Sequence, residues 1–145
     1  MKASNQKGAS AIEFAIILPV LVVLLFGALE YGLAMYNKQV ITNAGREGAR
    51  AGIAGDGATD IDGIVKDYCN GRLMTWADGI WHDGDGNPPS VTLSGAGCVF
   101  PVFPNNLKVT VTYLHKFLVA GIIGFDDKTI YSATVMKMEA SPSSP

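Results

Sequence analysis

Residues 8–29 read GASAIEFAIILPVLVVLLFGAL, an apolar run whose one charged residue is Glu13. A helix of this length is enough to cross the hydrocarbon core of a bilayer, so the run predicts a membrane-spanning segment. A carboxylate inside such a segment costs about 2.5 to 3.5 kcal/mol on the mildest insertion scale, and we therefore expect a partner to neutralise Glu13. The basic residues Lys2 and Lys7 come before the run and predict a short leader over residues 1–8.

The helical pattern continues beyond the apolar run, because residues 30–53 contain no helix breaker other than glycine. We expect one transmembrane and stalk helix over residues 9–53. Small residues recur in its second half at spacings of three and four, which lets another helix approach closely. This predicted packing stripe consists of Ala44, Gly48, Ala51 and Gly52. The alternative is that the glycines mark the end of the helix and the start of a flexible loop.

Residues 54–140 are expected to form a small head, so that the whole chain has an α+β fold. Thr59 is a possible cap for a short helix over residues 60–73, and the glycines and prolines of 78–89 predict a solvent loop. Three segments alternate apolar and polar residues and predict strands: 91–93, 107–113 and 129–136. The expected head is therefore a short helix with an antiparallel sheet of about three or four strands.

In the longest predicted strand, four apolar residues share the face expected to lie against a helix: Leu107, Val109, Val111 and Tyr113. The Ser- and Pro-rich tail, residues 141–145, is expected to be disordered.

The charge pattern and the histidines argue against several classes of function. The formal net charge is -2, without the basic stripe that marks a nucleic-acid binder. His82 and His115 stand apart from any cysteine ligand pair, HExxH sequence or serine nucleophile elbow. We therefore expect no enzymatic activity, no cofactor and no nucleic-acid partner.

The two cysteines, Cys69 and Cys98, both follow the apolar run and do not form a CxxC pair. In an exported domain this arrangement predicts a single disulfide. The alternative is a pair of buried free thiols.

A short acidic segment resembles the opening of a calcium loop, with oxygen ligands at alternate positions: Asp83, Asp85 and Asn87. Pro88 stands where such a loop needs glycine, and no bidentate glutamate follows. A plain turn is therefore favoured over a metal site.

Three stretches in the first fifty residues and one near the end resemble the TadE-like family of pseudopilins. They read GASAIEFAIILP (8–19), FGALEYG (26–32), NAGREGAR (43–50) and YSATVMKME (131–139). The resemblance implies a minor pilin or pseudopilin of the tight-adherence (Flp-type) pilus, or of a related secretion system. It further implies processing by a prepilin peptidase and a role in pilus assembly and adhesion.

By the same resemblance, the peptidase cuts between Gly8 and Ala9, and Glu13 with Phe14 serves recognition and assembly. A new amino group at Ala9 of one subunit could then form a charge-assisted contact with Glu13 of its neighbour. The implied partners are other pilin or pseudopilin subunits, the prepilin peptidase, inner-membrane and envelope components of the pilus machinery, and membrane lipid. The implied location is the bacterial inner membrane, with a single pass, an extracytoplasmic C-terminal head, and incorporation into an extracellular pilus left open.

The main alternative is a secreted or membrane-anchored binding or adhesion module, with or without calcium, in which residues 1–34 are a signal peptide. Gly32-Leu33-Ala34 offers the small-x-small site that signal peptidase needs. Against this alternative, the apolar run is longer than the roughly 7 to 15 residues of a signal-peptide core, and it carries an acid near its start.

Overall fold

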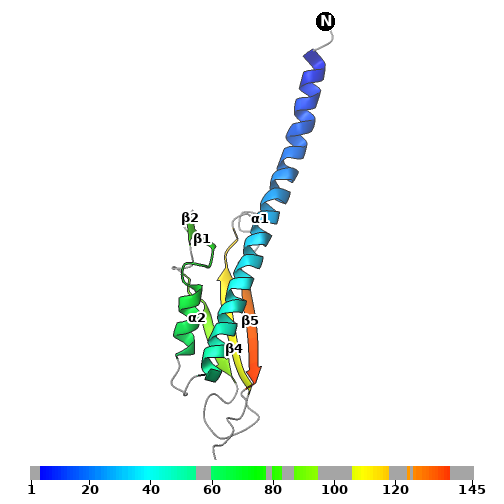
Figure 1. The fold of residues 1–145 in the computed structure, drawn as a ribbon. Helices are drawn as coiled ribbons and strands as arrows, with labels where there is room; N and C mark the ends of the chain where they lie inside the picture. Colours follow the sequence, from blue (N-terminus) through cyan, green and yellow to red (C-terminus); the bar gives the residue numbers. More distant parts are fainter. Residues whose placement is uncertain are drawn as a thin grey trace, which may run out of the picture.

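A computed structural model describes residues 4–54, 60–77, 80–82, 87–94, 106–117, 124 and 126–137 of the chain. One long helix, α1 (Ser4–Ala54), dominates it, and its N-terminal part projects far beyond a head made by the other elements (Figure 1). The head contains a second helix, α2 (Ile61–Cys69), and five strands. The strands are β1 (Thr75–Ala77), β2 (Ile80–His82), β3 (Ser90–Ser94), β4 (Asn106–His115) and β5 (Lys128–Lys137). The predicted α+β class, with a long apolar N-terminal helix, a short second helix and an antiparallel sheet, is confirmed.

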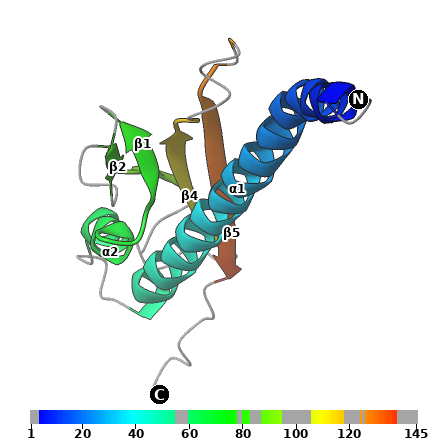
Figure 2. The same cartoon turned by 90° about the horizontal axis from the view of Figure 1, so that it is seen from above.

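The main sheet has three antiparallel strands in the order β3-β4-β5. Each strand covers one of the three segments predicted from alternation and extends it by one or two residues at each end. Figure 2 shows α1 crossing over β4 and β5, with α2 beside it. The two helices and the sheet therefore enclose one core.

The alternation along β4 puts its apolar residues into that core, as predicted. Leu107, Val109, Val111 and Tyr113 are buried, whereas Lys108 on the opposite face is exposed. The C-terminal half of α1 supplies the other wall of the core through four buried apolar residues: Val40, Ile41, Ala44 and Ala49. From α2 come Ile61, Val65 and Cys69, so the core joins segments far apart in the sequence.

The two helices approach each other at glycines of α1. A Cβ atom added to Gly48 would lie 2.5 Å from Cγ2 of Val65, and one added to Gly52 would lie 2.6 Å from Cδ1 of Ile61. Any side chain at Gly48 or Gly52 would collide with α2. The two glycines therefore allow α1 and α2 to pack this closely.

The short helix differs from its predicted limits at both ends. Its N-cap is Asp60, whose Oδ1 accepts a hydrogen bond from the Gly63 backbone N–H at 2.9 Å, and the predicted cap Thr59 lies outside the described residues. The helix ends at Cys69 instead of residue 73, because the backbone turns away at Asn70 (ψ 130°) and Gly71, whose left-handed φ of 68° continues the turn.

The prediction of a continuous loop over residues 78–89 was wrong for Ile80–His82, which pairs with β1 as a second, two-stranded sheet. Threonine, isoleucine and tryptophan favour strands, and they outweigh the neighbouring glycine and aspartate here. Residues 83–86 and the predicted tail at 141–145 lie outside the described residues.

Candidate functional site

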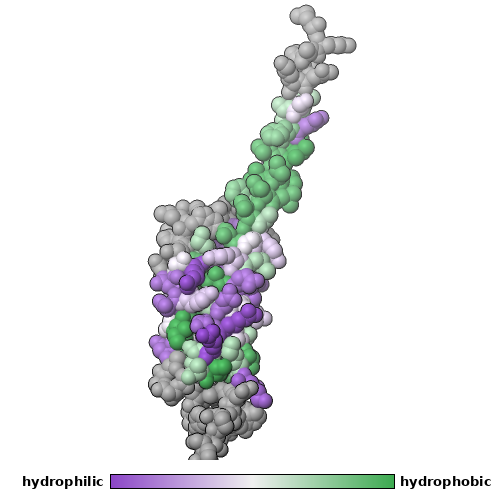
Figure 3. All heavy atoms as spheres, viewed as in Figure 1, coloured by the Kyte–Doolittle hydropathy of each residue, from purple (hydrophilic) through white to green (hydrophobic). Residues whose placement is uncertain are grey.

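The projecting part of α1 presents an apolar surface on every side. All residues from Gly8 to Leu29 are exposed, including Ile12 (64 %) and Leu24 (66 %), and none of them belongs to the core. Figure 3 shows this part as a continuous hydrophobic rod above a head of mixed polarity. Within the described residues, α1 is the one helix long and apolar enough to cross a membrane.

The residues predicted for processing and assembly lie at the far end of this rod. Gly8, Ala9, Glu13 and Phe14 all lie within α1, which already begins at Ser4 and continues through Pro19. Ala9 and Glu13 are four residues apart and so occupy the same helix face. An amino group created at Ala9 would therefore emerge on the same side as the carboxylate, and both are open to a neighbouring chain.

Below the rod, where α1 enters the head, a buried polar cluster ties the helix to the sheet. Asn37 is fully buried, and its side chain bonds the backbone of Met74 twice: its amide donates to the Met74 carbonyl, and its Oδ1 accepts from the Met74 N–H at 2.9 Å. Asn37 Nδ2 also lies 2.9 Å from Nδ1 of His115, the last residue of β4. One side chain thus joins α1, the approach to β1 and the end of β4.

Three further buried residues complete this polar cluster, which we define as Glu30, Asn37, Thr75, Tyr113 and His115. Glu30 is 8 % exposed one residue after the apolar run ends. The hydroxyls of Thr75 and Tyr113 are buried without a hydrogen bond of good geometry among the described residues. Burial raises the pKa of Tyr113, and the Thr75 hydroxyl acts against that shift.

Burial also determines the protonation of His115, which is 1 % exposed. It lowers the pKa of the imidazole, while the negative charges of Glu30 and Asp127 act in the opposite direction. The ring meets Phe117 edge to face, with the ring centroids 4.9 Å apart. The arrangement favours a neutral His115 that forms a hydrogen bond with Asn37 within the cluster.

Acidification is expected to destabilise the head through His115. The folded-state pKa lies below the ordinary value of about 6.5, so the unfolded chain takes up the proton first. The stabilising contribution is thus present above about pH 6.5 and is lost as the pH falls below it. Thermal unfolding of the full chain in detergent, followed by circular dichroism at about pH 7.5 and 5.5, checks this. The variant His115→Gln should show a smaller loss between the two pH values; an equal loss would contradict the assignment.

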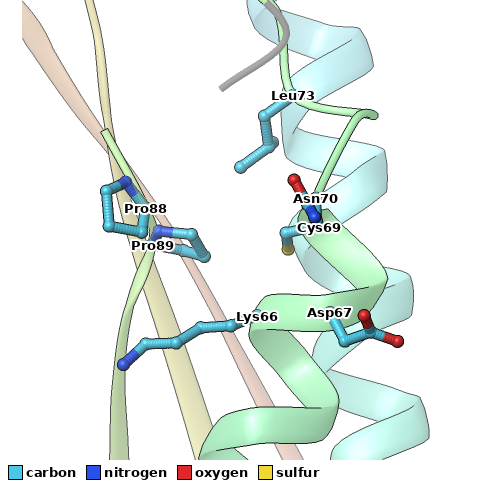
Figure 4. Close-up of a pocket in the computed structure, with 7 residues that line it drawn as sticks. All are labelled: Lys66, Asp67, Cys69, Asn70, Leu73, Pro88 and Pro89. Carbon is cyan, nitrogen blue, oxygen red and sulfur yellow. The ribbon is translucent and has the colours of Figure 1, made fainter. Parts of the chain in front are cut away.

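A cleft of about 300 Å³ lies between α2 and the residues that lead into β3 (Figure 4). It is lined by Lys66, Asp67, Cys69, Asn70, Leu73, Pro88 and Pro89. Burial raises the pKa of the Cys69 thiol to about 11, against a smaller opposing effect of Arg72, so the sulfur is a neutral thiol near pH 7. A thiol in that state is a poor nucleophile and a poor metal ligand.

The metal and disulfide predictions depend on residues beyond the described part. Among the described residues, no group of three or more histidine, cysteine or acidic side chains is placed to hold a metal ion. Asp83 and Asp85 lie outside these residues, and Asn87 donates to the backbone carbonyl of Leu114 at 2.8 Å. Cys69 is buried as a free thiol, while Cys98 is outside the described residues, so the disulfide stays a prediction.

Reasoning from the sequence missed the polar cluster, although a signal for it was present. Asn37 precedes Ala44 by seven residues and therefore lies on the same face of α1 as the small-residue stripe. A polar residue on the same helix face as the small-residue stripe is expected to be buried, and a buried polar side chain needs a hydrogen-bond partner. Its partners, the backbone of Met74 and the ring of His115, come from segments that no periodicity connects to α1.

Comparison with known proteins gives a match to the N-terminal segment alone. Residues 8–50 match the family model described as TadE-like protein, and this is the segment that carries the resemblance seen in the sequence. No curated protein and no solved structure matches the chain. The match covers the projecting rod and the part of α1 that carries Asn37 and Gly48.

Proposed function

We propose, from the premise that residues 8–50 are TadE-like, that this chain is a minor pilin or pseudopilin of a Tad pilus, processed by a prepilin peptidase. The TadE-like family implies association with the Tad pilus, and the subunit role is the further step. The observation that carries it is the exposed apolar half of α1, which bears Glu13 at one end and continues into the core of the head at the other.

The apolar rod needs an environment other than water. Thirteen large apolar side chains between Ile12 and Leu29 are exposed. At about 1.5 to 3 kcal/mol for each side chain, removing them from water is worth on the order of 20 kcal/mol or more. A bilayer supplies this environment for a single subunit, and the apolar helices of other subunits supply it in an assembled fibre.

Glu13 gives the rod a preferred register. A carboxylate on an otherwise apolar surface is costly unless an opposite charge meets it. An amino group at Ala9 of a neighbouring chain would be such a charge, and pairing requires the two helices to be offset along their length. The exposed positions of both residues leave room for this contact between chains.

Packing of Glu30 in the head argues against the alternative in which residues 1–34 are a signal peptide. Cleavage after Ala34 would remove Glu30, which is 8 % exposed and belongs to the polar cluster. It would also cut α1 only three residues before Asn37.

The proposal is tested by intact mass and N-terminal sequencing of the full chain recovered from membranes, with and without a co-expressed prepilin peptidase. We expect peptidase-dependent loss of residues 1–8. Cleavage after Ala34 would identify a secreted module, and a chain of unchanged mass would leave a membrane-anchored protein outside pilus processing; either result overturns the proposal.

Replacing Glu13 by glutamine is expected to prevent incorporation of the subunit into pili while leaving membrane insertion intact, because the variant keeps the shape of the side chain and loses its charge. The measurement is the amount of the chain in sheared pili and in alkali-washed membranes of the producing cells. The control is Glu47→Gln, which changes an exposed acid of α1 within the head. Equal incorporation of the Glu13 variant and the control would contradict the role of Glu13.

A further inference from the structure

The β1–β2 hairpin is a sheet of its own, joined to the rest of the head at its base, where Thr75 is buried. Its strands are three residues long and pair with each other, without joining the three-stranded main sheet. A two-stranded hairpin of this size is at best marginally stable in water. Something beyond its own hydrogen bonds must therefore support it.

The composition of the hairpin suggests what that support is. Trp76 and Trp81 are paired positions in the register of the two strands, and they are the two tryptophans of the whole chain. Tryptophan concentrates at membrane–water interfaces, where its apolar ring and its N–H group meet different surroundings. Both tryptophans thus lie within one short element.

The hairpin lies close to the level at which the apolar run of α1 ends. Asn37 holds the backbone of Met74, immediately before β1. Three strand residues advance about 10 Å, which equals about seven residues of helix. Figure 1 shows the hairpin at the end of the head from which α1 projects. By this rise, β1 advances from the level of Asn37 toward that of Glu30, where the apolar run ends.

Other residues mark the same level as a membrane boundary. Tyr31 and Tyr36 of α1 are exposed, as expected for an aromatic belt at the headgroups. At the same end of the head, the charges of Asp126 and Asp127 are balanced by those of Lys116 and Lys128. These residues give no excess of positive charge for anionic lipid to attract, so the contact we infer is with the interface of the bilayer and not with a charged headgroup.

We propose that the β1–β2 hairpin is a second membrane contact of this chain, lying in the interfacial layer of the bilayer beside α1. The inference rests on the proposed function, because the position of the bilayer is defined by α1 as the membrane anchor. Its partner is the lipid interface itself, and the contact is continuous with the membrane-spanning surface. It holds the head against the bilayer and stabilises a hairpin that would be marginal in water.

The two tryptophans provide the test. The full chain is reconstituted into phosphatidylcholine vesicles whose acyl chains are brominated either near the headgroup or near the bilayer centre. The single-tryptophan variants Trp76→Phe and Trp81→Phe are measured beside the unchanged chain. We expect a loss of emission that is larger with shallow bromine than with deep bromine, and protection from aqueous acrylamide.

Two tryptophans placed elsewhere, in a Trp76→Phe/Trp81→Phe background, calibrate the measurement. Val135→Trp, at the far end of β5 and exposed, should be quenched by acrylamide alone. Leu21→Trp, in the middle of the apolar rod, should be quenched most by deep bromine. Far-ultraviolet circular dichroism confirms that each variant keeps its helix content.

Flotation of the vesicles separates failure of the inference from failure of the proposed function. If the chain floats and the tryptophans behave like the Val135→Trp control, or are quenched most by deep bromine, the interfacial hairpin is overturned while anchoring by α1 stands. If the chain does not float with the vesicles, membrane anchoring fails and the inference falls with it.

Discussion

Replacing Asn37 by alanine is expected to lower the free energy of unfolding by about 3 to 5 kcal/mol. Three groups lose their partner at once: the N–H and the carbonyl of Met74, and Nδ1 of His115. Each buried polar group left unsatisfied costs about 1 to 3 kcal/mol. Thermal unfolding of the full chain in detergent should show a melting temperature lower by roughly 10 °C or more.

Two further variants separate the hydrogen bonds from the loss of volume. Asn37→Leu keeps about the volume of the side chain and removes its donor and its acceptor, so it should be about as destabilising as Asn37→Ala if the hydrogen bonds, and not the volume, account for the loss. Asn43→Ala changes an exposed asparagine on the same helix and should be close to neutral. If the Asn37 and Asn43 variants unfold at the same temperature, Asn37 does not join the helix to the sheet in the way described.

Replacing Gly48 by leucine is expected to destabilise the head by about 3 kcal/mol or more through overpacking. The first atom of the new side chain would already lie 2.5 Å from Val65 and 3.1 Å from Ile61, both on α2. Leucine is a better helix former than glycine by up to about 1 kcal/mol, so the measured loss is the packing cost less that gain. Unfolding of the full chain in detergent measures the difference.

The matched control is Gly32→Leu on the same helix. A Cβ atom there would have no neighbour within 4 Å, so the helix propensity should make this variant neutral or slightly stabilising. Should the Gly48 variant be as stable as the Gly32 variant, the close approach of α1 and α2 would be refuted. Loss of stability in both variants would instead point to a general effect on α1.

The elements that were predictable from the sequence are those governed by local periodicity. The apolar run and the absence of proline between residues 20 and 54 define α1, and alternation from Leu107 to Tyr113 defines β4 and its buried face. In both elements the same residue pattern repeats along the whole length, so every residue supports the same secondary structure.

The rest depended on contacts that local patterns do not encode. The hairpin at Ile80–His82 lies in a segment rich in turn residues, where two short strands give too little alternation to be recognised. The polar cluster needs Asn37 and His115, which are 78 residues apart and meet only because α1 crosses the end of β4. No local pattern in the sequence connects Asn37 with His115.

The uninterrupted course of α1 also fixes the direction in which the head points. Each residue turns an α-helix by about 100° and advances it by about 1.5 Å. The same helix carries Glu13 in its apolar part and Asn37 in the head. The number of residues between them therefore determines the angle, about the helix axis, between the side that bears Glu13 and the sheet. One residue inserted between Leu29 and Asn37 would swing the head by more than a quarter turn while moving it only slightly along the axis. In an array of parallel helices, the surface that every head turns outward would thus be set by a residue count.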